Sequence, residues 1–429
     1  MTNSAPHFQP TRDSNTMFQD TDHPQLPFPP HTRWDVEGGK EAGIYTWFKE
    51  IDEELENGWV LSGSQKMLML GGYSYLGLNK HPEISDSAIE AIKKFGTGMS
   101  GSRFLAGTTH LHARLEQKIA QLHQKDDALI YSSGYLANVS SIACLLGKND
   151  YIVCDKSNHA SILDGARYSQ AKLIRYPHND LNRLAEILQE LPHSSRRLVI
   201  TDGVFSMSGK VADIPEIARI CRKHQALLMV DECHSMFVLG ERGGGICDYF
   251  GMNPDDIDII MATLSKSIPA AGGYITASEK VINYLRHESR GFIYSIALSS
   301  AMAATALKGL EVFSRERGPL VAKLRSNTEL FTKTLKARGI ETGNSATSIT
   351  PIFVGNPIKA AVAARQCHEQ GLYIHAVFPP VVPKDKAILR ASITASHQED
   401  DLRVAAGKIA DIINGLNDSD LPEISGFNF

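Results

Sequence analysis

Short apolar runs alternate with helix-like segments from about residue 66 to residue 310, and this alternation constrains the fold more than any other feature. The apolar runs lie at 128–131, 151–154, 172–175, 198–202, 227–231, 257–262 and 272–276. Segments with helical periodicity lie between them, at 111–124, 136–147, 213–224 and 279–288. Strands that alternate with helices predict an α/β fold, in which a large, mostly parallel sheet is flanked by helices on both faces.

The chain of 429 residues is too long for one small core, so more than one domain is expected. Residues 1–33 are rich in proline and polar residues, which predicts a flexible N-terminal arm. Residues 34–65 are predicted to be a helical segment, because Ile44, Phe48, Ile51 and Leu55 recur at helical spacing within 41–58. The large domain is then expected to span 66–310.

The remaining part, residues 311–429, is predicted to hold a linker helix and a smaller α+β C-terminal domain. A long helical pattern covers about 299–337. Beyond it lie apolar runs at 348–354, 372–377 and 387–394, with helical patterns at 357–370 and 398–415. This mixture of strands and helices is typical of a compact α+β unit.

Composition and charge exclude several classes of protein. The formal net charge of −4 gives no reason to expect a nucleic-acid partner. No apolar stretch is long enough to span a membrane, and no signal peptide is visible at the N-terminus. The six cysteines show no metal-ligand spacing, and their use within apolar runs fits a reducing compartment. We therefore expect a cytoplasmic protein without a metal site.

Two strand ends carry residues that suggest a cofactor. The run 257–262 is followed by Thr263, Ser265 and Lys266, and the run 227–231 ends at Asp231 with His234 close behind. Ligands of parallel sheets bind at the carboxyl ends of strands. A lysine amine can form a Schiff base and the hydroxyls can bind phosphate, which suggests pyridoxal 5'-phosphate (PLP). Lys266 would hold its aldehyde, Asp231 its ring nitrogen, and His234 would lie near its phenolic oxygen.

Each of these residues also has a simpler interpretation. A lysine after a strand is often a solvated charge, an aspartate there often caps a turn, and a single histidine is more often structural. The hydroxyls around Lys266 and the small residues 270–273 after it favour the cofactor.

Further candidates follow other strands. Ser133, Gly134 and Tyr135 lie between the run 128–131 and a helix, where backbone N–H groups can bind an anion. His159 follows the run 151–154 and could lie flat on the cofactor ring. Arg390 could bind a substrate carboxylate, and a structural ion pair is about equally compatible with its position.

Seven blocks occur in an order that resembles the α-oxoamine synthases, PLP enzymes of the aspartate-aminotransferase fold (fold type I). The blocks are 72–78, Gly101-Ser102-Arg103 through Gly107, Ser133-Gly134-Tyr135 with Ala137-Asn138, Asn158-His159-Ala160-Ser161, 202–209, Asp231-Glu232-Cys233-His234, and Thr263 to Lys266. The resemblance covers about residues 66–400 and is nearest to the bacterial serine palmitoyltransferase group. Two departures are Cys233 and Ser299-Ser300, where many relatives carry other residues.

The resemblance implies a role for each matching residue. The catalytic residues would be Lys266, His159, Asp231 and His234; the other cofactor-binding residues Ser133, Gly134, Tyr135, Thr263, Ser265 and Ser295; and the substrate-binding residues Tyr73, Ser102, Arg390 and again His159. Ser295 matches a segment that reaches a neighbouring subunit's phosphate, which implies an obligate homodimer with the active site at its interface.

The implied reaction is a decarboxylative Claisen condensation. Lys266 would remove the α-proton of an amino acid, and the resulting carbanion would attack an acyl thioester of coenzyme A or of acyl carrier protein. The products would be an α-amino ketone and CO2. A PLP aminotransferase is the nearest alternative, because it would share Lys266 and Asp231. A non-catalytic partner subunit is the second alternative, and such subunits typically lack the lysine.

Overall fold

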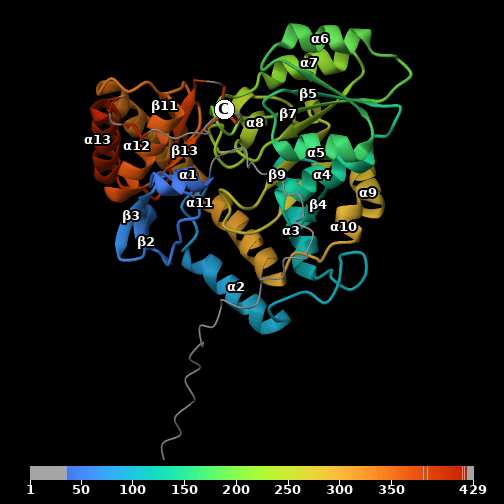
Figure 1. Cartoon of the computed structure of the whole chain (residues 1–429). Helices are drawn as coiled ribbons and strands as arrows, with labels where there is room; N and C mark the ends of the chain where they lie inside the picture. Colours follow the sequence, from blue (N-terminus) through green and yellow to red (C-terminus); the bar gives the residue numbers. More distant parts are fainter. Residues whose placement is uncertain (1–35, 380, 384, 418, 420, 423–429) are drawn as a thin grey trace, which may run out of the picture.

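The computed structural model describes residues 36–379, 381–383, 385–417, 419 and 421–422. The predicted arm at 1–33 lies outside these residues. Figure 1 shows a larger lobe built from the middle of the chain and a smaller lobe built from segments near both ends.

The larger lobe is organised around a seven-stranded sheet with the strand order β4-β10-β9-β8-β7-β5-β6. Its strands are β4 (Asp127–Tyr131), β5 (Tyr151–Asp155), β6 (Lys172–Tyr176), β7 (Arg197–Asp202), β8 (Leu227–Asp231), β9 (Ile259–Thr263) and β10 (Gly273–Ala277). Neighbouring strands are parallel except that β10 runs antiparallel to both β4 and β9. All seven apolar runs of the sequence therefore form strands, and the predicted α/β architecture is confirmed.

Helices cover both faces of this sheet. One face carries α4 (Gly134–Leu145), α5 (Ala160–Ser169), α9 (Glu279–Glu288) and α10 (Arg290–Ile293). The other carries α2 (Pro82–Phe95), α3 (His110–His123), α6 (Leu181–Glu190), α7 (Ile214–Lys223), α8 (Gly245–Phe250) and the first part of α11 (Ser300–Ala337). Successive side chains of a strand point to opposite faces, so Leu129 packs with the first group and Ile130 with the second.

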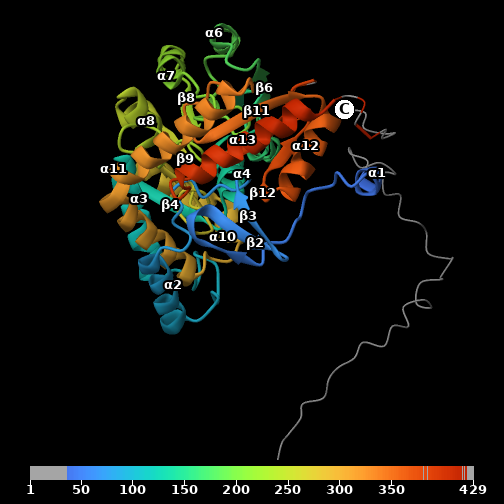
Figure 2. The ribbon, with the colours of Figure 1, turned by 90° about the vertical axis from the view of Figure 1, so that its left-hand side faces the viewer.

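The smaller lobe contains two small sheets and two covering helices. One sheet has the order β11-β14-β13, and the other has the order β1-β2-β3-β12. The strands are β1 (Glu53–Glu54), β2 (Trp59–Ser62), β3 (Gln65–Met69), β11 (Ile349–Gly355), β12 (Leu372–Tyr373), β13 (His375–Val377) and β14 (Ala387–Ser392). The helices α12 (Pro357–Glu369) and α13 (Glu399–Gly415) pack beside them, as Figure 2 shows. The predicted linker helix is α11, which spans 38 residues.

The predicted helix over 41–58 is wrong. A short helix, α1 (Val36–Glu41), ends where the predicted helix was expected to begin, and the next elements are β1 and the 3-10 turn η1 (Glu56–Gly58). Of the four apolar residues that suggested the helix, Ile44 is buried, whereas the side chain of Phe48 is 89% exposed at a φ of 57°. Strand β3 begins at Gln65 and pairs with β12 through residues 68–69, so the expected boundary at residue 66 cuts through a strand of the smaller lobe.

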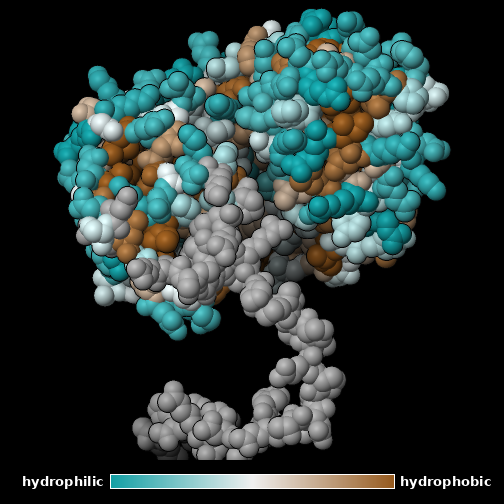
Figure 3. Space-filling view, turned by 45° about the horizontal axis from the view of Figure 1, so that its top comes forward, coloured by the Kyte–Doolittle hydropathy of each residue, from teal (hydrophilic) through white to brown (hydrophobic). Residues whose placement is uncertain are grey.

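The surface is mixed in polarity. On the face seen in Figure 3, hydrophilic side chains are spread over both lobes, and hydrophobic ones lie among them in smaller groups. Among the described residues, no helix combines the length and the apolar character needed to cross a membrane.

Candidate active site

The carboxyl ends of β5, β7, β8 and β9 meet at one edge of the large sheet and enclose a cavity of about 230 Å³. Its walls contain most of the residues singled out from the sequence: Ser133, Gly134, Tyr135, His159, Asp231, His234, Thr263, Ser265 and Lys266. Together with Asp202, which also lines the cavity, they come from five separate segments of the chain, which the parallel sheet brings to one place.

Asp231 lies at the end of β8 with its carboxylate held from two sides. One oxygen accepts a hydrogen bond from Asn138 Nδ2 of α4 at 2.8 Å, and the other accepts from the backbone N–H of Cys233 at 2.9 Å. Asp202, at the end of the adjacent strand β7, is buried and also lines the cavity. Burial, and then the neighbouring Asp231, raise the pKa of Asp202 well above its usual range. Burial and the neighbouring carboxylate thus both favour the protonated form of Asp202.

Lys266 contacts a histidine that is itself hydrogen-bonded. Its Nζ lies 3.0 Å from His234 Nε2, and the other ring nitrogen of His234 lies 2.7 Å from the hydroxyl of Tyr75. Burial, and then the charge of Lys266, hold the pKa of His234 well below its ordinary value. His234 is consequently a neutral imidazole.

The loop between β4 and α4 forms a pocket for an anion. Ser133 caps α4 by accepting a hydrogen bond from Leu136 N, so the N–H groups of the first helical turn face the cavity mouth. Thr263 Oγ1 lies 2.8 Å from Ser265 Oγ, and both residues line the same cavity beside this loop. A Cβ on Gly134 would lie 3.2 Å from Thr263 Oγ1, so any larger residue would crowd the cavity. Tyr135 is half exposed, and its hydroxyl bonds Asp164 of α5.

His159 is fixed at the start of α5. Its Nδ1 lies 2.7 Å from Ser161 Oγ, and its backbone N–H donates to Asp202 at 3.3 Å. Because Asp202 ends β7, this contact ties the histidine to the strand next to β8. The imidazole is thus held at the cavity wall by a local cap and by a neighbouring strand.

Arg390 reaches the site from β14 of the smaller lobe. Its Nε donates to Ser206 O at 2.8 Å and its Nη1 to Ser392 Oγ at 2.9 Å. The side chain stacks on Tyr73, at 5.3 Å from the ring centroid, and Lys266 Nζ lies 6.0 Å from the same centroid. Nη2 is buried without a hydrogen-bond partner among the described residues. The alternative of a structural ion pair is not seen in that part of the chain, because no carboxylate pairs with Arg390 there.

A second cavity, of about 340 Å³, shares Ser265 and Lys266 with the first. It lies between the two lobes, and Tyr73 forms part of its wall. Its other walls include the apolar side chains of Trp59, Val60, Met69 and Pro269. An extended, partly apolar molecule in this cavity would therefore end beside the lysine.

Ser102 and Ser295 do not line either cavity. Their two segments lie against each other, because Ala297 N donates to Gly101 O at 3.3 Å and His112 Nε2 lies 2.7 Å from Leu298 O. The structure thus groups them on another part of the surface.

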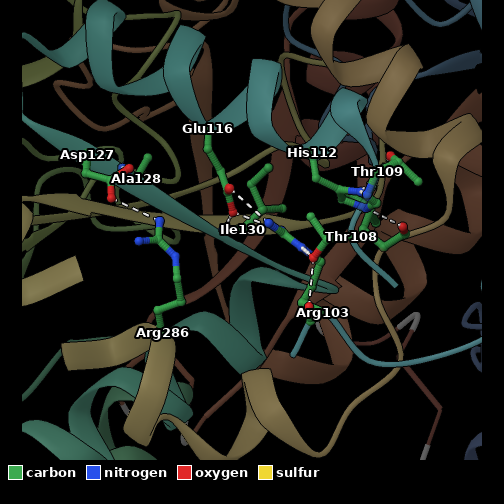
Figure 4. A network of polar contacts seen from close by, with 10 residues as sticks. Arg103, Thr108, Thr109, His112, Glu116, Asp127, Ala128, Ile130 and Arg286 are labelled. Carbon is green, nitrogen blue, oxygen red and sulfur yellow. Dashed lines mark hydrogen bonds and ion pairs between the residues drawn. The ribbon is translucent and has the colours of Figure 1, made fainter. Parts of the chain in front are cut away.

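A buried ion pair braces the Ser102 segment, as Figure 4 shows. Arg103 donates from both terminal nitrogens to Glu116 of α3, each at 2.9 Å, and Glu116 also accepts from Ile130 N in β4. The guanidinium lies 5.4 Å from the ring centroid of Phe292 in α10. One pair therefore fixes three segments, including the strand that leads into the anion-binding loop.

Three residues of the site were missed as individual candidates. Asn138 and Asp202 belonged to blocks noted in the sequence, and Tyr75 lay in the block 72–78, but none was given a role. A signal exists only for Asn138, because a polar residue one turn into a buried helix needs a partner. The contacts of Tyr75 and Asp202 join segments far apart in the chain, so their positions in the sequence do not reveal them.

The residues of the first cavity fit PLP. The lysine amine, the fixed carboxylate of Asp231, and the hydroxyls with the helix N-terminus provide partners for an aldehyde, a ring nitrogen and a phosphate. These three kinds of group line one cavity, as a ligand with three such functional groups requires.

Comparison with known proteins agrees with this chemistry. Residues 65–409 match the family of aminotransferases of class I and II. A serine palmitoyltransferase of Sphingobacterium spiritivorum is 38% identical over 87% of this chain and 93% of its own length. An 8-amino-7-oxononanoate synthase of Thermoanaerobacter pseudethanolicus is 37% identical over 88% and 95%. A solved serine palmitoyltransferase of S. paucimobilis, with a bound PLP–myriocin aldimine, has a TM-score of 0.85 at 28% identity and covers 89% of this chain and 97% of its own.

The match spans both lobes and includes the segments that form the cavity. The chain therefore belongs to the aminotransferase class I and II family and, within it, to the α-oxoamine synthases, PLP-dependent acyltransferases that condense an α-amino acid with an acyl thioester and release CO2.

Proposed function

We propose that this chain condenses a small α-amino acid, with serine as the first candidate, with an acyl thioester in the two joined cavities around Lys266. The observation that carries the proposal is the free Nη2 of Arg390, a buried donor beside Tyr73 and near the lysine. A buried cation with an unused N–H group is suited to bind a carboxylate. Serine is placed first because relatives named serine palmitoyltransferase match over most of the chain.

Each side chain has a task in this proposal. When bound, PLP supplies the electron sink that stabilises a carbanion at the amino acid's α-carbon. Lys266 would hold the cofactor's aldehyde until the substrate's amine displaces it, and the freed lysine amine would then take the α-proton, while Asp231 would keep the ring nitrogen protonated. His159 covers the ring, and Arg390 orients the substrate carboxylate. The preorganised charges of these groups stabilise the charge that develops during reaction.

The second cavity is the proposed site of the acyl group. Its apolar walls begin at Lys266, so an acyl chain placed there brings its thioester to the lysine. The α-carbon would form a bond to the thioester carbonyl as the thiol leaves. Loss of the carboxylate as CO2 and addition of a proton at the α-carbon would then give the α-amino ketone. Both coenzyme A and acyl carrier protein are compatible donors, because their thioesters present the same reacting group.

We also propose an obligate homodimer in which Ser102 and Ser295 complete the partner's site. Supporting this, both residues lie outside their own chain's cavities. The same surface exposes large apolar side chains: Phe104, Leu105, Tyr294 and Ile296. Exposed apolar groups gathered in this way are typical of protein interfaces.

The six cysteines are free thiols, which supports the proposal of a cytoplasmic location.

The test is a panel of glycine, alanine and serine added to the PLP-loaded enzyme, followed by acyl-CoAs of increasing length or acyl carrier protein thioesters. We expect one amino acid to change the cofactor's absorption, and thiol and CO2 to be released in equal amounts once a thioester is present. Lys266→Ala should abolish cofactor that borohydride can trap. Amino-group transfer to a keto acid without any thioester would instead show an aminotransferase.

A further inference from the structure

Tyr75 is a buried tyrosine whose hydroxyl reaches the lysine through a histidine. Its side chain is 1% exposed, and its hydroxyl lies 2.7 Å from His234 Nδ1. The opposite nitrogen of the same ring, Nε2, lies 3.0 Å from Lys266 Nζ. The three side chains thus form one line of polar contacts from the core of the protein to the reacting centre.

The protonation of the first two groups is fixed by their surroundings. Burial raises the pKa of Tyr75, although the charges of Arg390 and Lys266 oppose this, so the phenol keeps its proton. Burial and the charge of Lys266 lower the pKa of His234, so the imidazole is neutral. A neutral imidazole has one N–H, and the partner of one ring nitrogen therefore decides whether the other nitrogen donates or accepts.

The contacts of His234 indicate which of its two ring nitrogens carries the proton. A phenol is a good donor and a weak acceptor, and the nearby Arg390 cation draws electron density from its oxygen. A free Lys266 ammonium can only donate to Nε2, but in the PLP-loaded protein this amine is engaged by the cofactor's aldehyde. The proton of Tyr75 is then directed at His234 Nδ1, which leaves the ring's own proton on Nε2. No other ring nitrogen of the described residues contacts this hydroxyl.

The backbone of Tyr75 is held as firmly as its hydroxyl. Its carbonyl accepts from Ala395 N of the smaller lobe at 2.8 Å, and its N–H donates to Tyr73 O at 2.7 Å. The ring packs in the main core of the larger lobe. The backbone bonds fix the position of this residue, and core packing of its ring holds the phenol against His234.

We propose that Tyr75 is a positioning residue that fixes His234 as the tautomer with its proton on Nε2, directed at the atoms bound beside Lys266. This inference rests on the proposed role of His234 next to the cofactor's phenolic oxygen. An N–H directed at that oxygen withdraws charge from it, which weakens its hold on the proton it shares with the lysine-linked nitrogen. Tyr75 thereby changes how tightly the cofactor holds this proton without contacting the cofactor.

The first test is Tyr75→Phe in the PLP-loaded enzyme, with the cofactor's absorption followed as a function of pH. Without the hydroxyl, nothing fixes the ring proton of His234 on Nε2, and the cofactor's phenolic oxygen loses the N–H that withdraws charge from it. The midpoint of the pH-dependent spectral change should therefore rise by about one pH unit. We expect kcat to fall by about tenfold or more, with a smaller change in KM for the amino acid. An unchanged midpoint in a folded variant would overturn the proposal.

The chain offers a matched control in Tyr274→Phe. Tyr274 is also fully buried, and its hydroxyl lies 2.9 Å from His123 Nε2, a histidine outside both cavities of the site. The two variants lose the same kind of bond, so their losses of stability should be similar. The spectral midpoint of Tyr274→Phe should match that of the unmodified enzyme, and an equal shift in both variants would indicate a general structural effect.

Nitrogen NMR of histidine-labelled, unmodified enzyme tests the inference even if Tyr75→Phe does not fold. His234→Gln identifies the resonances of His234 by their loss. We expect the proton on Nε2 in the PLP-loaded protein, and a proton on Nδ1 would refute the assignment. Condensation by the unmodified enzyme is measured separately, so failure of the proposed function and failure of this inference give different results.

Discussion

Glu232 allows a quantitative test of how burial controls charge in this fold. It follows Asp231 directly, but its side chain points to the opposite face of the sheet, where it is 1% exposed. Its Oε2 accepts from Ser235 Oγ and from Ile246 N, each at 2.9 Å. Burial, which outweighs these two bonds, raises the pKa of Glu232 to about 7 from a usual 4.5.

The sign of the effect follows from the direction of the shift. A carboxyl whose pKa is higher in the folded state binds its proton more tightly when folded. Its stabilising contribution is complete below about pH 4.5 and is lost as the pH rises through about 7. A shift of about 2.5 units corresponds to about 3 kcal/mol over the whole titration, and most of it falls between about pH 5 and about pH 8.

The perturbation is Glu232→Gln, which removes the titration and keeps the size of the side chain. We expect the free energy of unfolding of the unmodified enzyme to fall by about 2–3 kcal/mol relative to the variant between about pH 5 and about pH 8. Urea unfolding of both PLP-loaded proteins measures this difference, since every other titrating group is common to them. The comparison needs only the difference between the two proteins at each pH.

Glu90→Gln is the control, because Glu90 is exposed on α2. Its difference from the unmodified enzyme should stay within about 0.5 kcal/mol at all pH values. If Glu232→Gln behaves like this control, burial does not hold a proton on Glu232, and the reasoning fails. A difference that grows in the opposite direction would mean that the two hydrogen bonds outweigh burial.

Three further predictions concern the buried pair, the anion-binding loop and the carboxylate site. Arg103→Ala should lower the free energy of unfolding in urea by about 3–5 kcal/mol, because Glu116 is left charged and buried, and replacing both residues by leucine should cost less. Gly273→Ala should weaken PLP affinity by about tenfold or more in a fluorescence titration, because its Cβ would lie 2.4 Å from Gly134 Cα. Arg390→Lys should raise KM for the amino acid by about tenfold, since lysine lacks the planar fork that leaves one N–H free.

The sequence predicted the large sheet well because its strands are buried on both faces. Such strands form continuous apolar runs, and all seven were found within two residues of their observed starts. The direction of β10 was not specified by its apolar run. Residues 264–272 separate it from β9, and this connection contains no helix to carry the chain back for a parallel strand.

The failed helix shows the limit of periodicity. Ile44, Phe48, Ile51 and Leu55 have helical spacing, yet only Ile44 packs into the core of the smaller lobe. Near the end of this segment, residues 53–54 form strand β1 and pair with β2 instead of continuing a helix. Spacing predicts a helix only where a core exists to receive the apolar face. Apart from Leu68 and Leu70, the core that Ile44 joins is formed by residues more than 250 positions later, from Phe331 onward.

The residues of the site also differ in how far the sequence predicts them. Residues at strand ends, such as Asp231 and Lys266, were predictable because topology alone brings strand ends together. Their supports were not, because Asn138 and Tyr75 act through contacts across 93 and 159 positions of sequence. Local pattern predicts where functional groups emerge from a sheet, whereas the groups that fix their protonation depend on packing between elements.

The last residue of β8, Asp231, and the residue that follows it, Glu232, differ in the kind of contact that holds them. Because side chains alternate along a strand, Asp231 faces α4 and the cavity, while Glu232 faces the core behind the sheet. Asp231 has Asn138 and a backbone N–H as partners in a cavity that also holds Lys266, whereas Glu232 has no cation within ion-pairing distance among the described residues. Two neighbouring carboxyls thus lie in different surroundings. Only Asp231 lines the cavity with Lys266, so the side of the sheet on which each carboxyl lies decides which one can bind a cationic ring nitrogen.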